Sequence, residues 1–225
     1  MSQLARRQAH LAGVLYLVTH VTSVAAVIAY GGGLLRAGVA LEFVLALGCL
    51  GTGVLLWVLL QSRGPARAAS FALLRTLEAA VIVAGALPML GSALVNATAE
   101  GESTAMHTAA FLLGQGLVIS VNTVILGWLL WDARAVPRAL AALGIAGGVI
   151  VLVSNGLQLA GAIPLNGVAA GVAAGVAAVP VFAFEIWFAV WLIAVGVRSE
   201  PGIRAAHEGG LPNSPHALKR PQVNT

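Results

Sequence analysis

Four ionisable side chains of this 225-residue chain lie inside long apolar stretches: Glu42, Arg75, Glu78 and Glu185. A charge in the interior of a bilayer costs roughly 2.5–3.5 kcal/mol on insertion scales, so each of these groups needs a partner or a purpose. A buried carboxylate can bind a solute or carry a proton, and a carboxylate beside a cation can also hold two helices together. Ion pairing, solute binding and proton transfer are therefore the candidate chemistries.

Arg75 and Glu78 are three residues apart, which places them on one face of a helix and within reach of each other. Counted from Ala68, Arg75 lies roughly 10 Å and Glu78 roughly 15 Å into the span, near the middle of a bilayer. Glu78 is therefore expected to be paired or protonated. An ion pair that fixes this helix to its neighbours is the plainer interpretation; a carboxylate that responds to protons or a ligand is the functional one.

Other polar residues reach a similar depth. His20 is about 15 Å into the first span and Gln115 about 12 Å into the fourth, and Asn122 shares the face of Gln115. Glu185 lies near the middle if the last helix begins around Ala173, but only about 8 Å deep if that helix begins at Pro180. One polar layer is predicted, made of His20, Arg75, Glu78, Gln115 and Glu185.

A second polar group is expected toward the outer face. Ser154, Asn155 and Gln158 share a face near the outer end of the fifth span, and Glu42 lies roughly 7 Å deep on the same side. These four residues favour either a small polar vestibule or simple hydrogen bonds between helices near the interface.

Sequence motifs of soluble enzymes are absent from the chain: it has no zinc-protease, phosphate-loop, nucleophile-elbow or Cys-x-x-Cys pattern. The only cysteine, Cys49, lies in an apolar stretch and is expected to be a buried structural thiol. We therefore predict no catalytic residue, cofactor or metal site.

Long apolar segments must position these groups. With 59% hydrophobic and 9% charged residues, the chain is too apolar for one soluble domain. An all-α polytopic membrane bundle is predicted, followed by a disordered basic tail at 198–225. The residues from 164 to 179 contain glycines every four positions and could extend the last helix or form a loop. The six expected spans cover approximately residues 10–30, 37–60, 68–95, 107–131, 139–163 and 173–197.

Lysine and arginine fall almost entirely on one side of this arrangement. Ten basic residues flank the spans on the side of both termini, and Arg36 alone lies opposite. By the positive-inside rule, both termini are cytoplasmic in a bacterial inner membrane. The net charge of +4 is thus expected to meet anionic lipid headgroups rather than nucleic acid. All five tryptophans occupy the cytoplasmic halves of the spans: Trp57, Trp128, Trp131, Trp187 and Trp191.

Four segments, at 5–17, 73–80, 127–140 and 180–191, together resemble the bacterial integral-membrane family catalogued as domain of unknown function 4386. The resemblance implies a six-helix membrane fold over roughly residues 5–197. It also implies an Arg-x-x-Glu motif in the third helix and a Glu before the final Trp, which fall on Arg75, Glu78 and Glu185. The family carries no established activity.

Three functional interpretations stay open. The first is proton-linked or small-solute transport or sensing through the polar layer, although no inverted repeat relates residues 1–100 to 101–197. The second is a non-catalytic regulatory protein whose glycine faces bind a partner helix or a second copy of the chain. An intramembrane enzyme is third, because the His and Glu residues permit it but no spacing requires it.

The charge pattern makes a direct prediction about topology. Reporter fusions after Arg67, near Glu102 and after Arg138 should give cytoplasmic, outer and cytoplasmic signals, respectively, because basic loops stay inside. An outer signal after Arg138 would contradict the six-span arrangement.

Overall fold

The computed structural model describes residues 2–99, 101–164 and 168–197, and every regular element within them is a helix. Six helical spans are long and apolar enough to cross a membrane, which confirms the all-α prediction. The expected tail at 198–225 lies outside the described residues. The elements are α1 (Gln3–Gly31), α2 (Leu35–Leu60), η1 (Gln61–Arg63), α3 (Pro65–Leu94), α4 (Glu102–Phe111), η2 (Leu112–Val118), α5 (Ile119–Asp132), α6 (Arg138–Leu159) and α7 (Val168–Ala194).

Glycine and proline set several of these boundaries. Gly33 has a φ of 74°, a conformation that glycine adopts without strain, and it separates α1 from α2. Pro65 occupies the first turn of α3 and Pro137 precedes α6, positions where no helical N–H is lost. The last helix begins at Val168, so the glycine-rich segment from 168 onward extends it. Elements α4, η2 and α5 follow one another without a break and form the fourth span.

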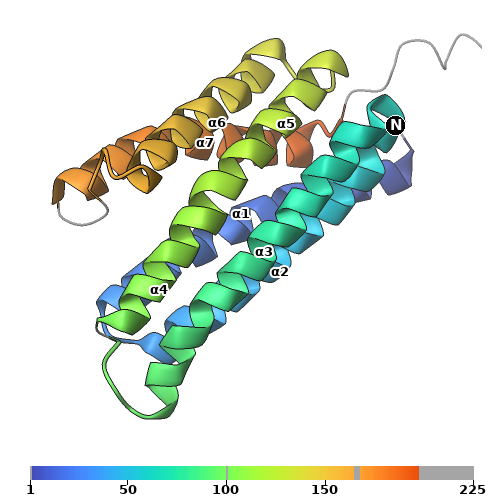
Figure 1. Cartoon of the computed structure of the whole chain (residues 1–225). Helices are drawn as coiled ribbons and strands as arrows, with labels where there is room; N and C mark the ends of the chain where they lie inside the picture. Colours follow the sequence, from blue (N-terminus) through green and yellow to red (C-terminus); the bar gives the residue numbers. More distant parts are fainter. Residues whose placement is uncertain (1, 100, 165–167, 198–225) are drawn as a thin grey trace, which may run out of the picture.

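The six spans form a closed ring in chain order. Each span packs against the next, and α7 returns to pack against α1 (Figure 1). Gly13 permits this closure, because a Cβ atom there would lie 2.6 Å from the carbonyl oxygen of Ala189. Gly53 similarly brings α2 close to α3, since its Cβ would lie 2.9 Å from the Cβ of Arg75. All six spans can therefore contribute side chains to one interior.

One end of the ring is closed by an apolar plug, to which every span contributes. Within it, the rings of Tyr16 and Phe188 meet edge to face with centroids 5.7 Å apart. Close packing of this kind leaves no path for water. The plug includes Ala12, Tyr16, Leu56, Leu60, Phe71, Leu126, Leu130, Leu140, Phe184, Phe188 and Leu192, all buried.

The opposite end is packed more loosely. Helix α4 buries no side chain, and in Figure 1 α6 and α7 diverge from α4 toward this end. The first turns of α7 are apolar and exposed, with Val172 and Val176 at 59% and 68% exposure. In a membrane such side chains contact lipid, and we call this end the open end.

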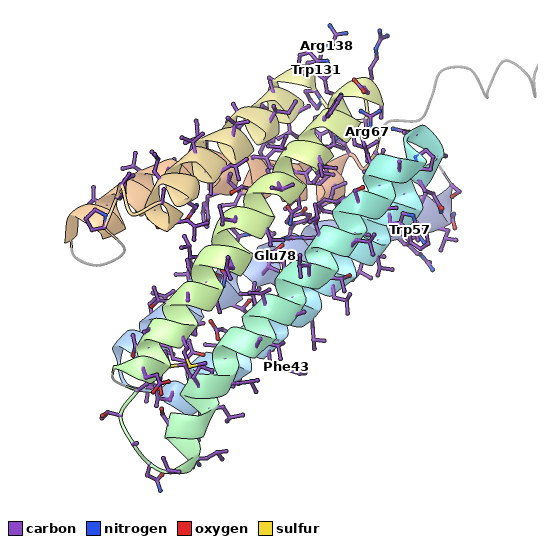
Figure 2. The ribbon with its side chains drawn as sticks, in the orientation of Figure 1. Phe43, Trp57, Arg67, Glu78, Trp131 and Arg138 are labelled. Carbon is purple, nitrogen blue, oxygen red and sulfur yellow. The ribbon has the colours of Figure 1, made fainter. Side chains whose placement is uncertain are left out.

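Basic and tryptophan side chains gather at the closed end. Figure 2 shows Trp57, Arg67, Trp131 and Arg138 together there. Arg67 forms an ion pair with Asp132 and lies 5.2 Å from the ring of Trp128, and Arg138 lies 5.4 Å from the ring of Trp131. An interfacial belt of this composition is typical of the cytoplasmic side, but the side that this end faces stays a prediction.

Candidate functional site

A buried ion pair on α3 forms the centre of the site. Arg75 Nη1 lies 2.9 Å from Glu78 Oε2 and 3.1 Å from Oε1, so the guanidinium donates to both oxygens of the carboxylate. Both side chains are only 2% exposed. The two residues are one helical turn apart, and this spacing lets the pair form within α3 itself.

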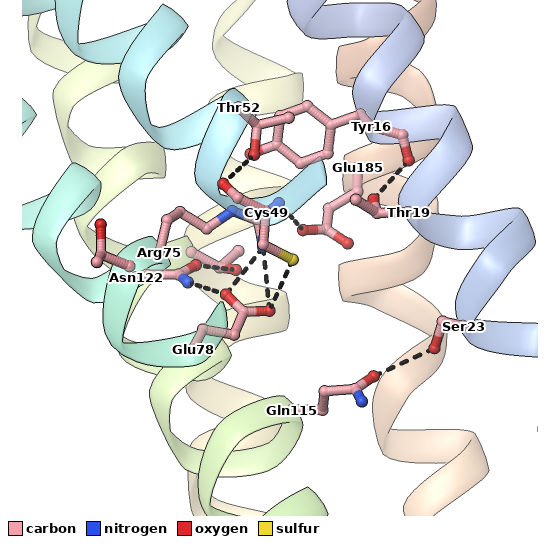
Figure 3. Close-up of polar contacts among 12 residues, drawn as sticks. Tyr16, Thr19, Ser23, Cys49, Thr52, Arg75, Glu78, Gln115, Asn122 and Glu185 are labelled. Carbon is pink, nitrogen blue, oxygen red and sulfur yellow. Dashed lines mark hydrogen bonds and ion pairs between the residues drawn. The ribbon is translucent and has the colours of Figure 1, made fainter. Parts of the chain in front are cut away.

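Glu78 also receives donors from two other helices. Asn122 on α5 donates through Nδ2 at 2.8 Å, and the Cys49 thiol on α2 lies 3.7 Å from Oε1 (Figure 3). A buried carboxylate with several donors is stable as an anion, because hydrogen bonds replace its lost hydration. Glu78 therefore acts as a fixed anion that ties α2, α3 and α5 together.

Arg75 extends this network toward α1 and α7. Its guanidinium carbon lies 5.0 Å from the centre of the Tyr16 ring, a cation–π distance. Its Nη2 lies 4.0 Å from Glu185 Oε1, too far for a hydrogen bond. The Nε atom is buried and has no hydrogen-bond partner among the described residues. The guanidinium thus keeps unused donor capacity on the side away from Glu78.

Glu185 and His20 form the second pair of the site. Glu185 Oε2 lies 3.3 Å from His20 Nε2, and the other ring nitrogen, Nδ1, donates to the Tyr16 carbonyl at 2.8 Å. Because a carbonyl can only accept, Nδ1 carries a hydrogen, and one further proton can reside on either His20 Nε2 or Glu185 Oε2. With that proton the four charged groups sum to zero, since Arg75 offsets Glu78; without it the site carries one negative charge.

Gln115 contributes from the fourth span, where it lies in the π-helix η2. Its Oε1 accepts a hydrogen bond from Ser23 on α1 at 3.1 Å. The π-helical turn is wider than an α-helical one and occurs frequently at functional sites. Here it carries the side chain that joins the fourth span to the first.

A cavity of about 180 Å³ lies at the centre of these groups. Each of the five residues of the predicted polar layer lies on its wall: His20, Arg75, Glu78, Gln115 and Glu185. Cys49 and Ser23 also line the cavity, and neither was predicted to belong to the polar layer. The sequence did offer one indication of their place, because each is a polar side chain within an apolar span. In the first five spans the cavity residues lie on the open-end side of the plug residues, and on α7 the cavity residue Glu185 lies one residue past the plug residue Phe184, so cavity and plug meet there. We call this space the central cavity.

Glu42 lies in a different cluster, at the open end. Its oxygens accept a hydrogen bond from the Tyr30 hydroxyl at 2.7 Å and meet His107 Nε2 at 2.8 Å. Neither Tyr30 nor His107 was expected to be a partner of Glu42. The aromatic rings of these two residues meet edge to face, with centroids 5.0 Å apart.

The other three residues of the expected vestibule stay on α6. Asn155 donates to the Val151 carbonyl at 2.8 Å, Ser154 is half-buried and Gln158 is buried. Helix α2, which carries Glu42, packs between α1 and α3, whereas α6 packs between α5 and α7. The order of the helices around the ring therefore keeps Glu42 apart from the polar face of α6.

Two further spaces accompany the Glu42 cluster. A pocket of about 1030 Å³ at the open end, the end pocket, has Tyr30, Arg36, Asn96, Thr104 and His107 in its wall. A void of about 10 Å³, the connecting void, is bounded by Glu42, His107, Phe111 and Gln115 among others. Within the described ranges, no three His, Cys, Asp or Glu side chains are grouped so as to hold a metal ion.

Comparison with known proteins identifies one match. A family model described as "Domain of unknown function (DUF4386)" matches residues 11–196. No curated protein and no solved structure matches the chain.

The Arg75–Glu78 pair predicts a strong non-additive effect on stability. Glu78→Gln and Arg75→Gln should each lower the free energy of unfolding in detergent by about 3–5 kcal/mol, because each strands the opposite charge. The double variant should recover part of this lost stability. Stability is compared through the midpoint temperature of thermal unfolding. Thr76→Ala is the matched control, since this exposed side chain bonds only to the Ala72 carbonyl of its own helix. Additive losses in the double variant would contradict the pairing.

Proposed function

The chain belongs to the family described as domain of unknown function DUF4386, whose description names no activity, and we propose a function from the central site. The protein is a multi-pass protein of the bacterial inner membrane, with both termini in the cytoplasm. It binds a small polar solute in the central cavity and couples this binding to one proton. It thus works as a proton-linked carrier or sensor of that solute.

The observation that carries the proposal is the incomplete coordination of Glu185 on the cavity wall. Its Oε2 meets His20 Nε2 at 3.3 Å, but its Oε1 lies 4.0 Å from Arg75 Nη2 and accepts no hydrogen bond from the described residues. A buried carboxylate oxygen without a donor is costly, whereas a solute or water that donates to it removes that cost. The central cavity therefore favours an occupant that carries hydrogen-bond donors.

The rest of the wall can orient such a solute. Gln115 offers an amide, Ser23 a hydroxyl and Arg75 its unused Nε–H group, while Phe182 and Val181 supply apolar contact. A few convergent polar groups in an otherwise apolar wall are typical of small-molecule sites. The volume of about 180 Å³ limits the solute to roughly the size of benzene, which fits an engineered cavity of about 150 Å³.

Coupling to a proton follows from the His20–Glu185 pair. A solute that donates to Glu185 competes for the position of the shared proton, because both neutralise the same carboxylate. Binding of the solute to Glu185 then releases this proton, and departure of the solute allows the proton to return. The apolar plug blocks the cytoplasmic end of this cavity, as a carrier requires in its outward-facing state.

A purely structural network would be dry and fully packed, because shielding strengthens an ion pair used only to join helices. This difference can be measured with a single cysteine in a Cys49→Ala background. A methyl-sized methanethiosulfonate should react with Ser23→Cys, which faces the central cavity, at least about tenfold faster than with Thr52→Cys, because close-packed interiors exclude reagents.

Thr52 is the matched control, since it is fully buried but lines none of the three cavities described above. Thermal unfolding of both variants verifies that they fold. Equal protection of the two cysteines would show a dry interior and contradict solute binding there.

Proton linkage can be tested directly in vesicles that contain a pH-sensitive dye. A carrier that alternates between its two open states moves the proton held by His20 and Glu185 past the plug, so under an imposed potassium diffusion potential vesicles with the wild-type protein should take up protons faster than protein-free vesicles. Glu185→Gln should slow this uptake at least about tenfold, since removal of a positioned proton carrier commonly costs a factor of roughly 10²–10⁴. Glu102→Gln, an exposed carboxylate at the start of α4, is the control. Wild-type uptake at the Glu185→Gln rate would contradict proton linkage.

A further inference from the structure

The three cavities follow one another along the bundle axis. On α3, the central cavity is lined by Arg75 and Glu78, the connecting void by Ile82 and Gly85, and the end pocket by Met89 and Ala93. At a rise of 1.5 Å per residue, this stretch of α3 from Arg75 to Ala93 spans roughly 27 Å, from the middle of the bundle to its open end.

The fourth span shows the same order in the reverse chain direction. Gln115 lies on the wall of both the central cavity and the connecting void, and His107 lies on the wall of both the connecting void and the end pocket. Phe111 also borders both the central cavity and the connecting void, whereas His107 is the one residue shared by the walls of the connecting void and the end pocket. No apolar plug comparable to that of the closed end intervenes among the described residues.

The side chains at the second junction are suited to proton transfer. Glu42 is 4% exposed and accepts from Tyr30, while His107 Nε2 lies 2.8 Å from its other oxygen. A histidine that donates through one ring nitrogen can accept a proton at the other, so an imidazole passes a proton across its width. A structural role would need only the hydrogen bond, not a ring that borders two cavities.

We propose that the Glu42–His107 pair is the proton relay through which the central site exchanges protons with the end pocket. This relay rests on the proposed function, because it supplies the proton held between His20 and Glu185. The relay gives a role to the Glu42 cluster, which lies outside the central site. It also means that protons reach the central cavity from the open end.

The steps conserve charge and atoms. A hydronium ion in the end pocket gives its proton to His107 Nδ1 and becomes water, and the Nε2 proton passes to Glu42 Oε1. Glu42 then gives this proton to a water in the connecting void, whose volume of about 10 Å³ matches a single water. The proton passes Gln115 into the central cavity and reaches the Glu185 carboxylate. His107 is then left with its hydrogen on Nδ1, and a turn of the ring that brings Nδ1–H toward Glu42 leaves Nε2 free to accept the next proton.

The charged and titratable groups around the relay come from three elements. Tyr30 on α1 donates to Glu42, and Arg36 on α2 lines the end pocket and donates to the Ala93 carbonyl at 3.3 Å. The residues of α3 that line the connecting void and the end pocket do not titrate: Ile82, Gly85, Met89 and Ala93. His107 itself comes from α4, so Glu42 and His107 are the pair able to exchange a proton between the two cavities.

The vesicle assay of proton uptake tests the relay with Glu42→Gln and His107→Gln. Each variant should slow uptake at least about tenfold, to the level of Glu185→Gln, because each removes one proton carrier of the series. Glu102→Gln and His10→Gln are the matched controls, since both residues are exposed and lie outside the three cavities. These controls should keep the wild-type rate.

The outcomes separate the relay from the function on which it rests. Slow uptake in Glu185→Gln with wild-type rates in both relay variants would overturn the relay and leave the proposed function standing. Wild-type rates in all three variants would overturn both.

A second measurement does not depend on removing the hydrogen bonds of Glu42. Thr104→Cys, in a Cys49→Ala background, places a thiol in the end pocket, and Met106→Cys places one outside it on the same helix. Labelling with a bulky cationic methanethiosulfonate in detergent, before reconstitution, should slow uptake at least about tenfold for position 104 and leave it unchanged for position 106, because only the first obstructs the pocket. Equal rates after labelling would overturn the relay.

Discussion

Arg75 places a permanent positive charge in the interior of the helical ring, and the arrangement of the other polar groups follows from it. A guanidinium cannot lose its proton in a protein, so its charge must be matched by neighbours. Glu78 forms a direct ion pair with the guanidinium, and the Tyr16 ring packs against one side of it. Glu185, on α7, lies nearby but beyond hydrogen-bond distance. Because Glu78 already neutralises Arg75, Glu185 is left as the carboxylate whose charge can change.

The sequence was sufficient for groups whose relationship is local or set by depth. The spacing of Arg75 and Glu78 within one helix predicts their contact, and depth counting brings His20 and Gln115 to the same level, whereas the depth of Glu185 depended on where the last helix begins; all five residues line one cavity. The partners of Glu42 were not predictable in this way, because Tyr30 and His107 become neighbours only through the order of the helices around the ring. Depth counting gives the level of a residue but not the direction in which it faces.

Packing differs sharply between the two ends of the bundle, and this difference gives the polar residues their use. Large apolar side chains from all six spans close one end, where glycines such as Gly13 allow the backbones to approach. Smaller interior residues and diverging helices leave three aligned spaces toward the other end. One ring of six spans thus has a closely packed apolar end and, toward the other end, a series of spaces lined by polar residues.

The intrahelical position of the Arg75–Glu78 pair also bears on how the protein is made. Both charges belong to one helix, so they can neutralise each other as soon as α3 forms, before any other helix has docked. The interior of the third span can then leave the translocation machinery without net charge, although it carries both Arg75 and Glu78. Glu185 belongs to the last span to be synthesised, and its cationic neighbours lie on α1 and α3, which are already in the bilayer. The order of synthesis therefore presents Glu78 and Glu185 to the membrane only when a cation is there to receive them.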